Sequence, residues 1–230
     1  MAVHDWAQLK RRWKDFHDRF IHEVVNIMID EELLPQGFNA IPTAQIYVER
    51  GFEPDVVVKK KEHTGSIRQS IEGTQIVQPT LHFVATRPDV SPEKHLMLID
   101  DLGEPVAVME VISPRNRTHR THYATQYEDY IRHGLTFVMV DLIYFVGENV
   151  HNLLISNWKN ALPIPDNPDN PLFIATYTPQ TEETVVAEIM QFGFNDDFPD
   201  VVIEVEGDSI LFPLAKAYQT TARRMKLPSV

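Results

Sequence analysis

Cysteine is absent from the 230-residue chain, which excludes disulfide bridges and thiolate metal sites and suits a reducing compartment. Long apolar runs are also missing, because none approaches the roughly 18 residues that a membrane-spanning helix needs. Residues 1–20 contain no apolar signal-peptide core. Together these absences predict a cytoplasmic protein with no membrane partner.

Positive charge is scarce. The 33 Asp and Glu residues outnumber the 21 Lys and Arg residues, for a formal net charge of −12. Phosphate binding needs positive potential, so this balance argues against a general nucleic-acid binder. The basic residues are unevenly spread, with clusters at 10–14, 59–61 and 115–120. Such clusters are usually solvated faces. The third cluster differs because it directly follows an apolar strand.

Glycine is sparse too, and the nine glycines form neither a Gly-rich phosphate loop nor a dinucleotide fingerprint. No GxSxG pattern or Ser-His-Asp arrangement accompanies Ser113, which therefore indicates a turn or a helix cap. These absences argue against nucleotide binding through a Gly-rich loop or a dinucleotide fingerprint, and against hydrolysis by a catalytic serine.

The residues present are sufficient for a globular core, since 43% are hydrophobic and 10% aromatic. Three- and four-residue apolar spacing predicts a helix over 13–34, and a second helix over 119–134 ends at Gly134. The all-apolar run at 135–147 is typical of a strand buried on both faces. Further predicted strands cover 43–51, 53–61, 172–178, 184–194 and 200–207, with a hairpin over 95–113 and a last helix over 212–225. Residues 62–94 indicate an insertion with irregular strand content, and 161–171 a loop.

This order predicts a mixed α/β fold with a central sheet flanked by helices. Residues 1–160 form the predicted core, and 161–230 a β-rich extension packed on that same core. Sixty to seventy residues with short apolar segments would bury too little surface alone.

Glu110 stands near the end of an apolar strand, in the sequence EPVAVMEVISPRNRTHR (104–120). An unpaired buried carboxylate costs several kcal/mol, so Glu110 needs a partner, a metal or a raised pKa. Asp55 opens a Val-Val-Val strand after Pro54. If the two strands are neighbours, the carboxylates converge within about 6 Å and can bind Mg²⁺ or Mn²⁺ through oxygen.

The segments FEPDVVV, VMEVISPRN and YEDYIRHGLTFVMVDLI resemble the restriction-endonuclease-like PD-(D/E)XK superfamily. Within it the chain is most similar to the bacterial domain-of-unknown-function family 4058, and Uma-type proteins share the E-V-x-S-P element. The resemblance covers roughly residues 6 to 145. It implies a restriction-endonuclease-like core with Asp55 and Glu110 as metal ligands.

One departure from this pattern concerns the superfamily's lysine, whose position two residues after the second carboxylate is Ile112 here. Arg117 is the predicted substitute, because arginine can stabilise developing phosphate charge although it cannot act as a base. The resemblance implies metal-dependent phosphodiester hydrolysis on DNA, with Asp55, Glu110 and Arg117 as catalytic residues. The alternative is an inactive nuclease-fold scaffold that serves in binding or assembly. A homo-oligomer stays open.

Five other residues have alternative interpretations. His17 is interpreted as a packing residue of the first helix. Glu23 or Glu31 could supply a third carboxylate, but each is more typical of a solvated helix face. His119 and His122, three residues apart, could contact a ligand or a metal, but they are interpreted as flanking the start of the second helix.

Overall fold

The computed structural model describes residues 3–6, 9–42, 47–48, 56–60, 78–87, 96–97, 104–114, 118–144, 149–205 and 207–227. Its elements in chain order are η1 (Lys10–Arg12), α1 (Trp13–Asp30), β1 (Phe38–Pro42), β2 (Tyr47–Val48), β3 (Val56–Lys60), β4 (Leu81–Thr86), β5 (Leu96–Met97), β6 (Glu104–Val111), α3 (Arg120–Arg132), β7 (Thr136–Asp141), α4 (Val150–Leu154), β8 (Leu172–Pro179), β9 (Thr184–Phe192), β10 (Val201–Val205), β11 (Asp208–Phe212) and α5 (Leu214–Arg224).

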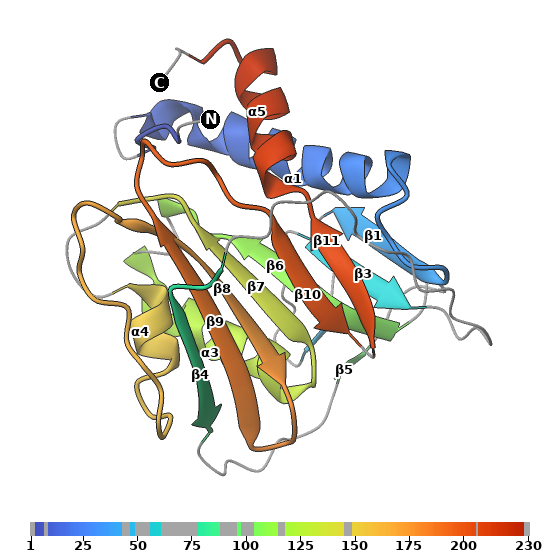
Figure 1. Cartoon of the computed structure of the whole chain (residues 1–230), viewed down its shortest axis with the longest axis vertical. Helices are drawn as coiled ribbons and strands as arrows, with labels where there is room; N and C mark the ends of the chain where they lie inside the picture. The colour runs from blue at the N-terminus through green and yellow to red at the C-terminus, as the bar shows by residue number, and fades with distance from the viewer. Residues whose placement is uncertain are drawn as a thin grey trace.

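A seven-stranded sheet runs through the molecule in the order β1-β3-β6-β7-β8-β9-β4 (Figure 1). β6 and β7 are parallel, and the other pairings in this sheet are antiparallel. The predicted mixed α/β class is therefore confirmed. Within the described part of the chain, no helix is both long enough and apolar enough to cross a membrane.

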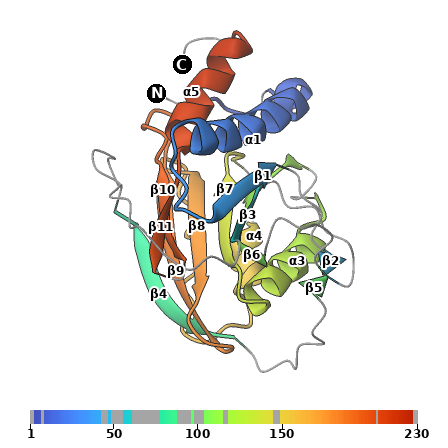
Figure 2. The ribbon, with the colours of Figure 1, turned by 90° about the vertical axis from the view of Figure 1, so that its right-hand side faces the viewer.

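Helices cover both faces of the sheet (Figure 2). On one face, α1, α5 and the β10–β11 pair bury an apolar cluster that includes Phe16, Phe20 and Tyr218. On the other face, α3 and α4 bury a second cluster that includes Tyr127 and Trp158. The sheet thus has an α1–α5 face and an α3 face.

The connection from β6 through α3 to β7 is a crossover between parallel strands. α3 ends as predicted before Gly134, which adopts a φ of 81°, a backbone conformation that favours glycine. The Leu135 N–H then donates to the Tyr130 carbonyl at 3.2 Å. Every residue of β7 is buried, as its apolar sequence predicted. Parallel pairing brings the carboxyl ends of β6 and β7 to one edge of the sheet.

The predicted hairpin over 95–113 is wrong. β5 pairs with β2 in a separate two-stranded sheet, while β6 pairs with β3 and β7. A strand that is apolar on both faces belongs in the centre of a sheet, where it has a neighbour on each side. The short strand β1 was not predicted. It ends at Pro42 and lies at the sheet edge, where a proline is tolerated.

Candidate functional site

Glu110 lies near the carboxyl end of β6, where its register partner is Met139 of β7. Only 5% of its surface is exposed. Beyond it, the Ile112 N–H donates to the Val140 carbonyl at 2.8 Å, so strand pairing continues past Glu110. The carboxylate is therefore held inside the sheet and not at a frayed end.

Helix α3 supplies partners for this carboxylate. The Tyr130 hydroxyl lies 3.4 Å and the Gln126 Nε2 atom 3.5 Å from Glu110 Oε1, both long hydrogen bonds. Gln126 Nε2 also donates to the Tyr130 hydroxyl at 2.6 Å. Gln126 and Tyr130 stand four residues apart on the helix and so share one face. The need for a partner, which the sequence predicted, is met in part by neutral side chains.

Ile112 is completely buried in the apolar cluster that also contains Tyr127 and Tyr130 of α3. It therefore lies on the same side of the sheet as Glu110, as the two-residue period of a strand predicted. At the position where the related superfamily has its lysine, this chain places an aliphatic side chain against α3.

Asp141, at the end of β7, is a second buried carboxylate, and the sequence-based search for site residues missed it. None of its surface is exposed, and its Oδ1 accepts a hydrogen bond from the Ile143 N–H at 3.1 Å. Phe137 and Met139 belong to the α3 face, so alternation assigns Asp141 to that face too. The available signal was the same as for Glu110: a charge inside an apolar strand.

Asp55 and Arg117, the other two predicted catalytic residues, lie outside the described residues. Asp55 directly precedes Val56, and the register partner of Val56 is Met109, the residue before Glu110. The predicted separation of the two carboxylates, the metal site and the role of Arg117 stay predictions.

Glu23 of α1 and Glu31, which directly follows α1, pair with basic residues of α5. Glu23 pairs with Arg224, and Glu31 pairs with Lys216. Since Glu110 contacts α3 across the sheet, neither helix residue supplies its third carboxylate. His17 fits the packing interpretation, because its ring lies 5.9 Å from that of Trp13 and its Nε2 lies 3.3 Å from the Val111 carbonyl.

In the part of the chain that the structure describes, no group of three or more His, Cys, Asp or Glu residues could hold a metal ion. No family model, curated protein or solved structure matches the chain.

Proposed function

We propose that the chain is a restriction-endonuclease-like protein that binds Mg²⁺ or Mn²⁺ through Asp55 and Glu110 and hydrolyses phosphodiester bonds in DNA. The observation that carries the proposal is the burial of Glu110 at the carboxyl end of a parallel strand pair. The register between β3 and β6 supports it, because Val56 follows Asp55 in the sequence and pairs beside Glu110. Carboxylate oxygens are the ligands that these cations prefer.

Each residue has a distinct role in this proposal. A bound divalent cation would polarise the attacking water and the phosphate. Gln126 and Tyr130 fix the orientation of the Glu110 carboxylate, as partners of a metal ligand commonly do. Arg117 stabilises the charge that develops on the phosphate, but it remains protonated and cannot accept a proton from water.

Ile112 favours a second candidate function, an inactive scaffold of the same fold. Its side chain is fully buried and apolar at the lysine position, so it can neither orient a water molecule nor stabilise phosphate charge. The net charge of −12 also disfavours binding to DNA over most of the surface.

Metal binding is tested by thermal unfolding with Mg²⁺ or Mn²⁺. Free metal at about one hundred times its dissociation constant should add about 2.7 kcal/mol to the stability of the folded protein. Asp55→Asn and Glu110→Gln should each abolish this gain. Asp166→Asn is the matched control, because Asp166 also follows a proline but lies exposed in the loop before β8. No shift at millimolar metal would leave only the scaffold.

Catalysis is tested on supercoiled plasmid with the same metals. We expect weak or no cleavage by the native chain, and measurable cleavage by Ile112→Lys that disappears in the double variants with Asp55→Asn or Glu110→Gln. A lysine at this buried position costs several kcal/mol unless it pairs with Glu110, so the melting temperature of each variant is measured first. Strong native cleavage lost in Glu110→Gln would show that the arginines suffice. A folded, metal-binding Ile112→Lys protein without cleavage would refute the hydrolytic proposal.

A further inference from the structure

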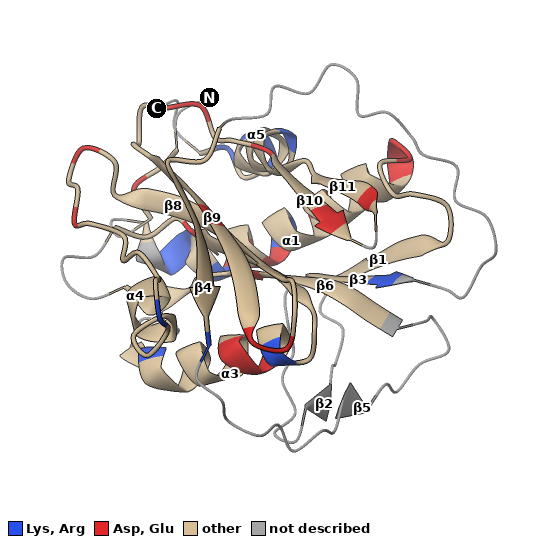
Figure 3. Ribbon diagram, turned by 60° about the horizontal axis from the view of Figure 1, so that its bottom comes forward, with Lys and Arg blue, Asp and Glu red and all other residues tan. Residues whose placement is uncertain are grey.

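The chain around helices α1 and α5 has a positive balance of charge in an acidic protein, and Figure 3 colours its basic and acidic residues. Residues 10–32 and 214–227, which include both helices, contain nine Lys and Arg residues against six Asp and Glu residues, whereas the whole chain has a net charge of −12. The fold brings the two segments together: the Arg12 guanidinium donates to the Met225 carbonyl, and the Phe16 and Tyr218 rings lie 5.4 Å apart. The local potential therefore favours an anion here, although the chain as a whole does not.

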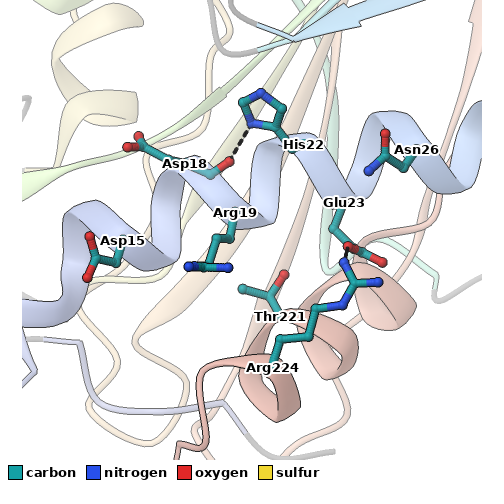
Figure 4. A pocket seen from close by; sticks show the side chains of 8 residues that line it. All are labelled: Asp15, Asp18, Arg19, His22, Glu23, Asn26, Thr221 and Arg224. Atoms are coloured by element: carbon teal, nitrogen blue, oxygen red, sulfur yellow. Dashed lines mark hydrogen bonds and ion pairs between the residues drawn. The ribbon is translucent and has the colours of Figure 1, made fainter.

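A groove of about 360 Å³ runs between the two helices (Figure 4). Arg19 projects from α1 toward α5, where Thr221 and Arg224 line the opposite wall. Asp18 and His22 point away from α5, and the His22 ring bonds the Asp18 carbonyl. The side chains that converge on the groove therefore include two guanidinium groups.

Thr221 adds an unusual feature to this groove. The residue is only 1% exposed, and its Oγ1 atom has no hydrogen-bond partner within the described structure. A helical threonine often donates its hydroxyl to a carbonyl of the preceding turn. Thr221 makes no such bond within the described structure. Because a buried polar atom without a partner is destabilising, Thr221 indicates a missing hydrogen-bond acceptor in the groove.

The groove also contains its own counter-ion. Arg224 Nη1 donates to Glu23 Oε2, and the Glu23 side chain is 10% exposed whereas that of Arg224 is 61% exposed. Glu23 thus holds Arg224 over the groove and occupies part of its donor capacity. Asp15, one helical turn before Arg19, and Asp18 are the other acidic residues that line the α1 side of the groove.

We propose that the α1–α5 groove binds an oxyanion of the phosphate type, with Arg19 and Arg224 as charged donors and the Thr221 hydroxyl as the third donor. Guanidinium groups match phosphate oxygens in geometry and charge, and a hydroxyl completes the set. Glu23 competes with the ligand for Arg224. The groove lies on the α1–α5 face, while Glu110 contacts α3, so this site is independent of the function proposed above.

Isothermal titration calorimetry with the full chain tests the site, using inorganic phosphate and a short single-stranded oligothymidylate as probes. Arg19→Gln and Thr221→Val should each weaken binding by about five-fold or more, because each removes one donor. Glu23→Gln should strengthen it, since the competing carboxylate is gone. Lys216→Gln is the matched control: it removes one positive charge from α5 at a residue that pairs with Glu31, away from the groove.

The two probes separate free phosphate from the phosphodiester of a nucleic acid, according to which of them binds and responds to the variants. Melting temperatures without ligand establish that every variant is folded, and Arg19→Lys replaces Arg19→Gln if the latter is not. Equal losses in Arg19→Gln and Lys216→Gln would reduce the effect to general electrostatic attraction and overturn the proposal. Weaker binding in Glu23→Gln, or no binding of either probe to the native chain, would overturn it too.

Discussion

At the scale of single residues, His151 is a titratable group buried inside the α3 face. Its Nδ1 lies 2.5 Å from the Tyr177 hydroxyl and its Nε2 lies 3.2 Å from the Leu162 carbonyl. A carbonyl only accepts, so the proton belongs on Nε2, and Tyr177 donates to Nδ1. Burial lowers the pKa of His151 to about 4, against the opposing effect of the Leu162 hydrogen bond. Burial also raises the pKa of Tyr177 well above its usual value.

The neutral His151 predicts a loss of stability in mild acid. Between about pH 6.5 and pH 4 the unfolded chain binds a proton at this histidine that the folded chain does not, so stability falls as the pH falls. The loss from this group amounts to about 3 kcal/mol over that range. His151→Gln should lower stability at pH 7 and flatten the pH dependence, as measured by urea unfolding at several pH values. His22→Gln, on the exposed side of α1, should keep the native slope, and equal slopes in all three proteins would contradict the prediction.

Glu110 shows how much of the candidate site could be predicted from one residue of the sequence. A carboxylate in an apolar strand must have partners whatever the fold, so the need for them could be predicted. Their identity could not, because Gln126 and Tyr130 lie 16 and 20 residues further along and meet Glu110 only when α3 packs on the sheet. Asp141 carried the same signal in β7 and was overlooked, since no second motif pointed to it.

At the scale of elements, the start of α5 depends on a distant carboxylate. Pro213 occupies the N-cap position and provides no side-chain hydrogen bond. Instead, Asp200 Oδ1 accepts from the Ala215 N–H at 2.8 Å. Desolvation raises the pKa of Asp200, and the Ala215 hydrogen bond partly opposes this rise. One of the free N–H groups at the helix start is therefore satisfied from the chain just before β10.

Replacing Asp200 separates the hydrogen bond from the charge. Asp200→Ala should cost about 1 kcal/mol in the free energy of unfolding, because it removes the acceptor at the helix start. Asp200→Asn keeps an acceptor and removes a partly desolvated charge, so it should change stability by only about 0.5 kcal/mol or less. Denaturant unfolding at pH 7 measures both. If asparagine costs as much as alanine, the charge matters and the hydrogen bond does not.

The elements that could be predicted were those with long or uniform patterns. The periodic α1 and α3 and the largely apolar β7 each carry enough signal locally. β1 and β11 were missed, and β5 was paired wrongly, because short strands take their stability from partners elsewhere in the chain. β4 illustrates this dependence, since its partner β9 follows it by about one hundred residues.

At the scale of the whole molecule, the beginning and end of the described chain are tied together. The Val3 N–H donates to the Phe194 carbonyl at 2.8 Å, and the His4 N–H donates to the Tyr218 hydroxyl at 2.7 Å. The Tyr218 ring also packs against Phe16 and Phe198. In the seven-stranded sheet, β8 lies between β7 and β9. Residues after 160 therefore contribute to both faces of the core.

A chain that ends at residue 160 should not fold to the native state. It would lack β8, and with it the partner of the fully buried β7, so the backbone groups on one side of that strand would be exposed. It would also lack α5 and the β10–β11 pair, leaving the apolar face of α1 without much of its cover. We expect an insoluble or molten protein that shows helical far-ultraviolet signal but no near-ultraviolet signal and no cooperative melting. Adding residues 161–230 as a separate chain should restore the near-ultraviolet signal if the two parts form one core. Cooperative melting of residues 1–160 alone, with the near-ultraviolet signal retained, would show instead that the sheet is stable without its last strands.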